Sequence, residues 1–420
     1  MSSTTQASPS RPWYRRVGPG LIIACVVIGP GSIMTSSGVG AEHGYAMSWV
    51  VLLAVMFMLV FTSLGAKLGV VTGESSGSLV ARRAGRPLAV LIGLAVFFIS
   101  AAFQSGNNLG VHYAFKDYLD AFKSHLDLDY TIVVFNVVSI TFLFAFQNLY
   151  RAIERLMMAF VGLMLLAFAL NLAFAGPDLV EMARGLIPGT QAAVDIKMLG
   201  LVGTTFVITA AYFQTYLVRQ KGWGREQLAD GLLDARVGAV IMALITLMIM
   251  ATAAAALRGQ TLKHPDDVAR GLAPLFHEWG RPIFYLGLFS AAYSSFLVNS
   301  MIGGFILADG LGLGSRPTDL APRICTTVVL LTGMTVALVV IKTESEAVPA
   351  IAAAQAVTVI ASPLIAGTLW WLTSRRDIMG EDRNGPWTNV AAGLGFLLLL
   401  GMSWYTATEK VLPAVREWWG

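Results

Sequence analysis

Long apolar stretches without any charged side chain are the feature that most restricts how this chain can fold. Asp, Glu, Lys and Arg together make up 13% of the 420 residues, about half their share in soluble domains. A helix that crosses a bilayer needs about 20 mainly apolar residues. The sequence therefore predicts an all-α integral membrane protein with eleven spans, at about 17–43, 46–71, 87–114, 130–149, 154–175, 197–219, 234–257, 282–309, 323–341, 347–373 and 387–408.

The basic residues between these segments predict the orientation of the chain. Most of the 29 lysine and arginine residues fall in loops on the side of the N-terminus, and short loops rich in Lys and Arg stay in the cytoplasm. We therefore expect a multi-pass protein of the cell (inner) membrane, with a cytoplasmic N-terminal tail at 1–16 and a C-terminal tail at 409–420. A cleavable signal peptide is not expected.

Composition also excludes several classes of function. The sequence contains no basic, aromatic-rich patch of the kind that binds nucleic acid. The net charge of +4 comes from the loops. The spans contain no nucleophile–base pair, metal-binding cluster or nucleotide loop, so an enzyme is not expected. The two cysteines, Cys25 and Cys325, both lie in apolar segments, where no disulfide is expected.

The first apolar segment is interrupted by Gly29-Pro30-Gly31-Ser32. Proline lacks an N–H donor and glycine frees the backbone, so this run should unwind the helix at mid-depth. The helix that restarts at about Ser32 would present free N–H groups and a partial positive charge to the break, which suits an anion. A simple proline kink is the alternative.

A second interruption is predicted five spans later. Gly203, Thr204 and Thr205 are followed by Thr209 in the sixth segment. Breaks at matching places in two five-helix halves are typical of inverted-repeat transporters, which bind their substrate between the breaks. The chain therefore divides into a first repeat at 17–175, a second repeat at 197–373 and an additional span at 387–408.

Away from the ends of the spans, the polar residues are neutral except for the titratable His112. Gln104, Asn107 and Asn108 lie on one face of the third span because they are three and four residues apart, and Gln355 lies in the tenth span. Taken singly, such residues more often form contacts between helices. A bare divalent cation is costly to hold without carboxylates, so an interior of this kind favours an anion or a neutral solute.

A series of short motifs follows the chain from about Gly18 to Asn384. These are Gly18-Pro19-Gly20, Pro30-Gly31, Gly44-Tyr45, Leu68-Gly69-Val70-Val71-Thr72-Gly73, Arg151 with Glu154, Ser294-Ser295 and Ser374-Arg375-Arg376-Asp377-Ile378-Met379-Gly380-Glu381. In order and spacing they resemble the Nramp family of metal-ion transporters. The resemblance implies a LeuT-like fold, with two inverted repeats of five helices, helices 1 and 6 broken at mid-membrane, and an eleventh helix.

The substrate motifs of that family are altered in this chain. Metal-carrying members have Asp-Pro-Gly-Asn where this chain has Gly29-Pro30-Gly31-Ser32, and Met-Pro-His where it has Val207-Ile208-Thr209. An Asp and a Glu of the family's proton route correspond to Gln104 and Asn107. Gln355 keeps the family's polar side chain at the metal site. The other changes remove charge or the soft ligands that select Mn or Fe.

These changes predict a secondary transporter with an acid-free site that carries a small inorganic anion, specifically bicarbonate, by alternating access. The alternative is a divalent metal cation transporter for Mg²⁺ or Mn²⁺ that uses carbonyl and hydroxyl ligands, and a non-transporting receptor is a third hypothesis. The expected substrate-binding residues are Gly29, Pro30, Gly31, Ser32, Thr204, Thr205, Val207, Thr209 and Gln355, with an accessory polar path of Gln104, Asn107 and Asn108.

The ion that is coupled to substrate transport is predicted less directly than the substrate-binding site. Ser294 and Ser295 lie where LeuT-like proteins often bind sodium, so Na⁺ is the candidate coupling ion, although metal-carrying Nramp proteins resemble this chain there as well. Strong proton coupling is not expected, because the proton route is neutral. No other cofactor and no resident metal are expected. The expected partners are a small inorganic solute and the lipid bilayer, and the chain should act as a monomer.

Overall fold

The computed structural model describes residues 17–121, 129–146, 148–189, 196–263, 265–276, 280–343 and 359–411. These residues are helical and contain no strand. The helices up to residue 184 are α1 (Pro19–Val27), α2 (Pro30–His43), α3 (Ser48–Thr72), α4 (Ser76–Arg83), α5 (Arg86–Ala121), α6 (Asp129–Ala145), α7 (Leu149–Ala175) and α8 (Leu179–Arg184).

The later helices begin at residue 196. They are α9 (Ile196–Thr205), α10 (Ile208–Gln220), α11 (Leu228–Ala256), α12 (Pro265–Phe276), α13 (Gly280–Leu311), α14 (Leu320–Lys342), α16 (Ser362–Ser374), α17 (Arg376–Met379) and α18 (Pro386–Thr406). Short turns complete the chain at η2 (Arg225–Gln227), η4 (Val359–Ala361), η5 (Gly380–Asp382) and η6 (Ala407–Val411).

The described helices fall on the apolar segments predicted from the sequence. Eight of them are long and apolar enough to cross a membrane, and α1 with α2 forms a ninth, bent span. Two shorter apolar helices, Tyr130–Ala145 and Val359–Ser374, overlap the predicted fourth and tenth segments. The first part of the tenth segment, with Gln355, lies outside the described residues. The chain is therefore a multi-pass membrane protein.

Several helices begin earlier than hydropathy alone predicted. The fifth span was expected from residue 154, but α7 starts at Leu149, where the Asn148 side chain accepts a hydrogen bond from the Arg151 N–H (3.3 Å). The seventh was expected from residue 234, but α11 starts at Leu228. Charged residues at these helix ends lower the local hydropathy, but the helical backbone continues through them beyond the apolar part of each span.

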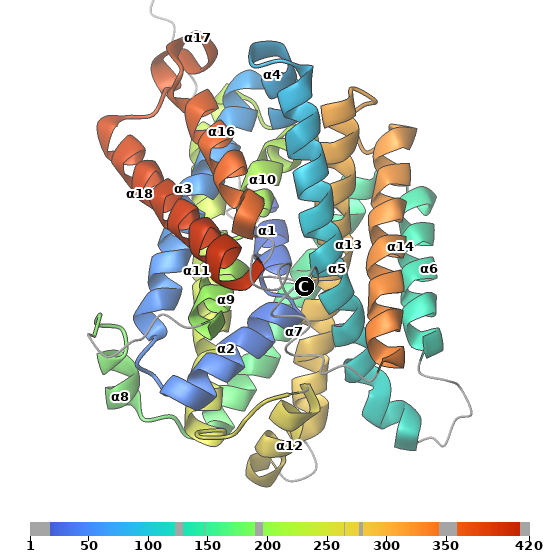
Figure 1. The fold of residues 1–420 in the computed structure, drawn as a ribbon, viewed down its shortest axis with the longest axis vertical. Helices are drawn as coiled ribbons and strands as arrows, with labels where there is room; N and C mark the ends of the chain where they lie inside the picture. The colour runs from blue at the N-terminus through green and yellow to red at the C-terminus, as the bar shows by residue number, and fades with distance from the viewer. Residues whose placement is uncertain are drawn as a thin grey trace, which may run out of the picture.

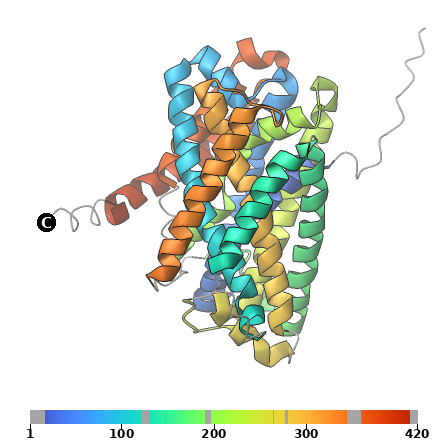
Figure 2. The same cartoon turned by 90° about the vertical axis from the view of Figure 1, so that its right-hand side faces the viewer.

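The core of the molecule is formed by the broken helices and α13. Every residue in the apolar window of Pro282–Leu311 is buried, and 94% of the window of Met198–Gln220 is buried, against 28% for α14 and for α18. In Figure 1, α1 and α2 lie near the middle of the bundle, whereas α6 and α14 lie at one side. Figure 2 shows α18 leaning away from the body of the protein. The two broken helices are thus enclosed by other helices.

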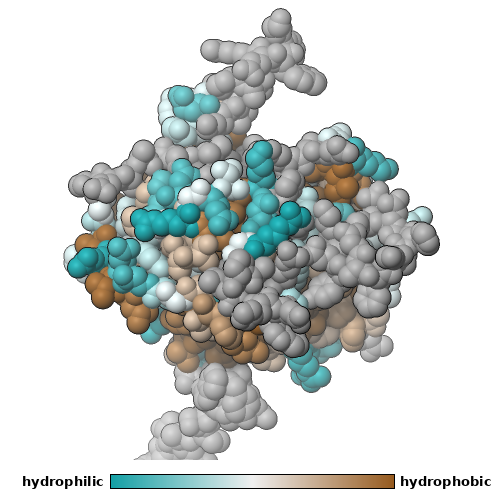
Figure 3. Space-filling view, turned by 90° about the horizontal axis from the view of Figure 1, so that it is seen from below, coloured by the Kyte–Doolittle hydropathy of each residue, from teal (hydrophilic) through white to brown (hydrophobic). Residues whose placement is uncertain are grey.

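Two faces of the bundle are distinguished by the short helices. The face where α1 begins and α10 ends also carries α4 and α17 (Figure 1), and we call it the N-terminal face. The opposite face carries α8 and α12. Seen from that side in Figure 3, hydrophilic residues gather toward the middle and hydrophobic ones near the rim. This distribution is expected where a bundle end meets water and its flank meets lipid.

Candidate functional site

The first broken helix opens at Ile28 and Gly29. α1 ends at Val27, α2 begins at Pro30, and the two halves meet at 57°. The sequence predicted a restart at about Ser32, but the helix starts two residues earlier, because proline fits the first position, where an N–H would lack a helical partner. The Ser32 hydroxyl turns back to donate to the Val27 carbonyl, which also accepts the Gly29 N–H at 3.2 Å.

The second break is at Phe206-Val207, just after the predicted Gly203-Thr204-Thr205 run. α9 ends at Thr205 and α10 begins at Ile208, and the pair continues as one span. Thr205 and Thr209 are 0% and 2% exposed, and their hydroxyl groups have no hydrogen-bond partner in the described structure. A buried hydroxyl without a partner is costly, so these two groups are the strongest candidates to contact a substrate.

A hydrogen bond joins the two breaks. The Thr35 hydroxyl of α2 lies 3.2 Å from the Thr204 hydroxyl of α9. Thr35 also donates to the Gly31 carbonyl at 2.7 Å, four residues back on the same helix. Sequence analysis did not single out Thr35, although its spacing from Gly31 places it on the face of α2 that carries the break. The structure thus brings the first and second breaks together.

The third span and α13 complete the surroundings of the first break. A Cβ atom placed on Gly29 would lie 3.0 Å from the Ser295 Oγ and 3.3 Å from the Asn107 Oδ1. The Ser295 hydroxyl is 3.2 Å from the Val26 carbonyl at the end of α1. A side chain at this position would push these polar groups back by a few tenths of an ångström. Asn107 and Ser295 therefore lie beside the break, and the accessory and sodium-binding roles given to them from the sequence stay predictions.

The other predicted polar residues are less directly connected to the breaks. Asn108 donates to the Gln104 carbonyl at 2.8 Å, and its Oδ1 accepts a hydrogen bond from Asn136 of α6 at 2.7 Å. It joins α5 to α6 rather than extending the path from Asn107. Gln104 accepts a hydrogen bond from Asn107 at 3.3 Å, whereas its Nε2 has no partner among the described residues. The accessory path stays a prediction.

Two further predicted groups have simple positions. Ser294 donates to the Ala291 carbonyl at 3.1 Å within α13 and lies beside the Cys25 side chain of α1. Val207 is 5% exposed and precedes α10, whose start has no side-chain cap. The predicted substrate-binding residue Gln355 falls outside the described residues.

The described break residues carry no charge. Their available ligands are hydroxyl, amide and backbone groups, and the described part of the chain contains no group of three or more His, Cys, Asp or Glu residues placed to hold a metal. Oxygen ligands of this kind suit hard cations that keep part of their water shell. The soft thioether and carboxylate set that selects Mn²⁺ or Fe²⁺ is missing from the described break residues.

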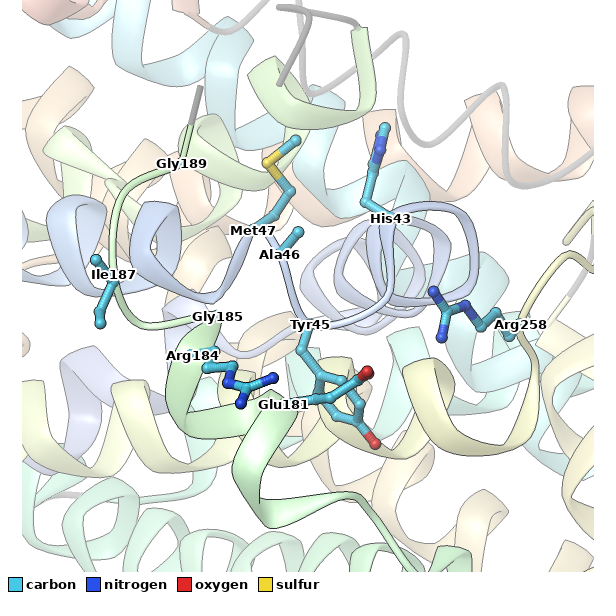
Figure 4. Close-up of a pocket in the computed structure, with 10 residues that line it drawn as sticks. All are labelled: His43, Tyr45, Ala46, Met47, Glu181, Arg184, Gly185, Ile187, Gly189 and Arg258. Carbon is cyan, nitrogen blue, oxygen red and sulfur yellow. The ribbon is translucent and has the colours of Figure 1, made fainter. Parts of the chain in front are cut away.

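A cavity of about 510 Å³ lies on the opposite face, beyond the end of α2. Figure 4 shows Arg184 and Arg258 on different sides of Tyr45, with Glu181 beside the tyrosine. The Asp178 N–H donates to the Tyr45 hydroxyl at 3.3 Å. Burial raises the pKa of Tyr45 above its ordinary value. This pocket has two arginines and one glutamate in its lining, which gives it a positive balance.

Comparisons with known proteins identify the family. The sequence profile described as Nramp, natural resistance-associated macrophage protein-like, matches residues 20–409. A divalent metal cation transporter MntH of Pectobacterium carotovorum is 25% identical over 410 residues and covers 94% of each chain. The MntH of Chromohalobacter salexigens is 27% identical over 401 residues, covering 90% of this chain and 88% of the relative.

A solved structure agrees with this assignment at the level of the fold. The manganese transporter of Eremococcus coleocola, crystallised with an aromatic bis-isothiourea compound, superposes with a TM-score of 0.79 at 17% identity. The match covers 96% of this chain and 89% of that one. The predicted LeuT-like, all-α fold with a broken first and sixth helix is confirmed. The chain belongs to the Nramp family of membrane transporters.

Proposed function

We propose that this chain is a secondary transporter of divalent metal cations that works by alternating access. The named relatives are divalent metal cation transporters, and they favour this class over the bicarbonate transport expected from the sequence, for which the comparisons offer no support. Oxygen atoms at the two breaks would contact the ion. The single observation that carries the site is the pair of buried, unpartnered hydroxyls of Thr205 and Thr209.

The chemistry of these ligands favours a hard ion over a soft one. Hydroxyl, amide and carbonyl oxygens suit Mg²⁺, which keeps several waters and needs fewer protein charges. Mn²⁺ shares this oxygen preference but gains more from the thioether and carboxylate that other family members supply. Mg²⁺ is therefore the first candidate substrate and Mn²⁺ the second. Low affinity is expected, because no negative side chain among the described break residues offsets the loss of water.

Uptake into proteoliposomes tests the proposal. Vesicles with the purified chain and empty vesicles are compared for Mg²⁺ and Mn²⁺ uptake under an imposed gradient, and the Thr205→Val/Thr209→Val double variant is assayed beside them. We expect Mg²⁺ uptake that saturates and a lower apparent affinity in the double variant. Absence of uptake of both cations above empty vesicles would contradict divalent cation transport.

A small anion such as bicarbonate is the second candidate. Two specific observations favour it. The starts of α2 and α10 receive no hydrogen bond from the side chain of their capping residues, Gly29 and Val207, and a helix start attracts negative charge. The pocket with Arg184 and Arg258 on the opposite face would raise the local anion concentration. Labelled bicarbonate in the same vesicles decides between the two: uptake of bicarbonate without cation uptake would establish the anion.

Sodium coupling is part of the proposal. The Ser295 hydroxyl and the Val26 carbonyl at the end of α1 provide two oxygens near the first break, and Ser294 lies beside them. Substrate flux measured with equal sodium concentrations on both sides of the membrane, and then with an imposed sodium gradient, tests this directly. An unchanged flux would remove Na⁺ as the coupling ion. A single chain is the proposed transport unit, with its N-terminus in the cytoplasm, because both breaks meet within it.

A further inference from the structure

The start of α1 is held by a buried carboxylate from another helix. The N–H groups of Gly18 and Gly20 donate to Oδ1 and Oδ2 of Asp234 at 2.7 and 2.6 Å. Asp234 lies near the start of α11 and is 0% exposed. The first N–H groups of a helix have no partner within the helix, and α1 has no side-chain cap of its own. Asp234 thus caps α1 from a distance.

A lysine connects the same end of α1 to two further helices by hydrogen bonds. Lys221 follows α10, and its Nζ donates to the Val17 carbonyl and to Glu154 Oε1, both at 2.7 Å. Glu154 is part of α7. The side chains of Lys221 and Glu154 are only 13% and 18% exposed, so solvent screens the pair less than a surface pair. One lysine therefore links the start of α1, the end of α10 and the start of α7.

Glycines allow α1 and α11 to touch through their backbones. A Cβ atom on Gly20 would overlap the Asp234 carbonyl, and one on Gly238 would overlap the Gly20 carbonyl. Small residues permit this close approach between membrane helices. The approach is what lets one carboxylate reach two N–H groups of α1. The contact depends on the absence of side chains and would be lost by a small outward movement of α1.

The second half-helix on the N-terminal face is held in a similar way. Asp309 of α13 accepts hydrogen bonds from the Tyr216 hydroxyl of α10 at 2.6 Å and from the Ser75 hydroxyl at 2.7 Å. It also accepts from the N–H and the hydroxyl of Ser78 in α4, at 3.0 and 2.6 Å. Asp234 and Asp309 are the two carboxylates classed as buried among the described residues. Asp234 holds α1 and Asp309 holds α10, the two half-helices that reach this face.

We propose that Asp234, with Lys221, is a positioning residue of the transport cycle that keeps α1 docked while the N-terminal face is closed. This rests on the alternating access proposed above. Opening the breaks toward this face requires movement of α1 or α10, and α1 can turn about Ile28 and Gly29, where the helix is already interrupted. Its release breaks two hydrogen bonds to a charged acceptor, which are stronger than neutral ones.

The native cysteines provide the measurement. Cys25 lies in α1 with 0% exposure, and Cys325 is the other cysteine of the chain. In a Cys325→Ser background, the rate at which a maleimide modifies Cys25 in detergent-solubilised full-length protein reports how often α1 leaves its site. We expect Asp234→Asn and Lys221→Met each to raise this rate at least fivefold. Lys221→Arg, which keeps the charge, should stay within twofold of the background rate.

Controls separate undocking from unfolding. Asp377→Asn removes an exposed carboxylate on the same face and should leave the Cys25 rate unchanged. Each variant must elute as a single species and unfold in one cooperative thermal transition. Transport should show a changed maximal rate rather than only a changed apparent affinity, because docking controls the conformational step. A Cys25 rate in folded Asp234→Asn and Lys221→Met equal to that of the background would overturn the proposal.

The result is independent of the substrate assignment. Cys25 modification needs no ligand, so it reports on α1 even if the chain carries an anion. Absence of cation uptake by the native protein would refute the proposed function and would leave the Cys25 comparison intact. Conversely, unchanged Cys25 rates in a chain that transports Mg²⁺ would refute only the role of Asp234 and Lys221.

Discussion

The Thr35 and Thr204 hydroxyls lie 3.2 Å apart and connect the two broken helices. Both residues belong to the half-helices that lie between the breaks and the opposite face, α2 and α9. On the N-terminal face, α1 and the end of α10 are connected instead through Lys221. The breaks are therefore bridged by neutral hydroxyls on one side and by charged groups on the other. Neutral hydrogen bonds are the weaker of the two.

Substitution of Thr204 tests the neutral bridge. Thr204→Val removes the hydroxyl, while Thr35 keeps its hydrogen bond to the Gly31 carbonyl. We expect a loss of about 1 kcal/mol in the free energy of unfolding, the usual value of one hydrogen bond, and a lower transport rate. Thr204→Ser keeps the hydroxyl and should behave like the native protein in thermal unfolding and uptake. An equal loss in both variants would assign the effect to packing.

Removing the unpartnered hydroxyls should separate stability from affinity. Thr205→Val and Thr209→Val replace a buried hydroxyl that lacks a partner with a methyl of similar size. Such a change is close to neutral or stabilising for folding. The apparent affinity for substrate should nevertheless fall about tenfold, equivalent to about 1.4 kcal/mol. Thr62→Val, another buried and unpartnered hydroxyl, is the matched control, and its affinity should not change.

A substitution at Gly110 tests how tightly α5 packs against the first break. A Cβ atom at Gly110 would overlap the Pro30 ring and lie 3.1 Å from Ala292. Gly110→Ala should therefore displace Pro30, cost about 1–3 kcal/mol in stability and abolish most transport. A Cβ atom at Gly162 in α7 would meet no other part of the described structure within 4 Å, so Gly162→Ala should fold and transport normally. Normal uptake by Gly110→Ala would show that the site tolerates a shift of Pro30.

The pH dependence of stability should depend in part on Asp377. Hydrogen bonds from Arg375 hold the pKa of the Asp377 carboxyl below its ordinary value of 3.8, and Arg83 of α4 contacts it at 3.0 Å. A lowered pKa means that the carboxylate stabilises the folded state above pH 4, and that this contribution disappears as the pH falls through the lowered pKa.

The comparison with Asp377→Asn isolates this contribution. The difference in melting temperature between the native protein and the variant should be constant from pH 8 to pH 5 and should shrink below about pH 4. Thermal unfolding in detergent at each pH measures it. The effect should be small, because the pair is exposed and screened by salt. A difference that grows as the pH falls would contradict the assigned ion pairs.

The fold was predictable because hydropathy and helix breakers act locally. Long apolar runs predict the spans, and Gly29 with Pro30 predicts the first break close to where it occurs. The second break was harder, because Phe206-Val207 contains neither glycine nor proline. The helix is interrupted there while continuing as one span, so the sequence pointed only to the glycine and threonines just before it.

The contacts between distant segments could not be predicted in the same way. Asp234 reads as an ordinary charged residue near a helix start, and its burial against Gly18 depends on how α11 meets α1. Asn108 shares a helix face with Gln104 in sequence, yet it binds Asn136 of another helix. The relatives favour a divalent cation over the bicarbonate expected from the sequence, and the reason is related. Lost charges indicate which ligands are absent, but they do not indicate what a partly hydrated ion can accept.

The uncharged lining of the breaks also determines how the membrane potential acts on the cycle. With no charged side chain among the described break residues, the empty carrier moves little charge as it reorients. A bound ion carries its full charge through the field, worth about 2.3 kcal/mol per elementary charge at 100 mV. Voltage then accelerates or slows only the loaded step, in opposite directions for a cation and an anion. In sodium-free solution, the electrical current at a fixed gradient therefore reports the sign of the cargo.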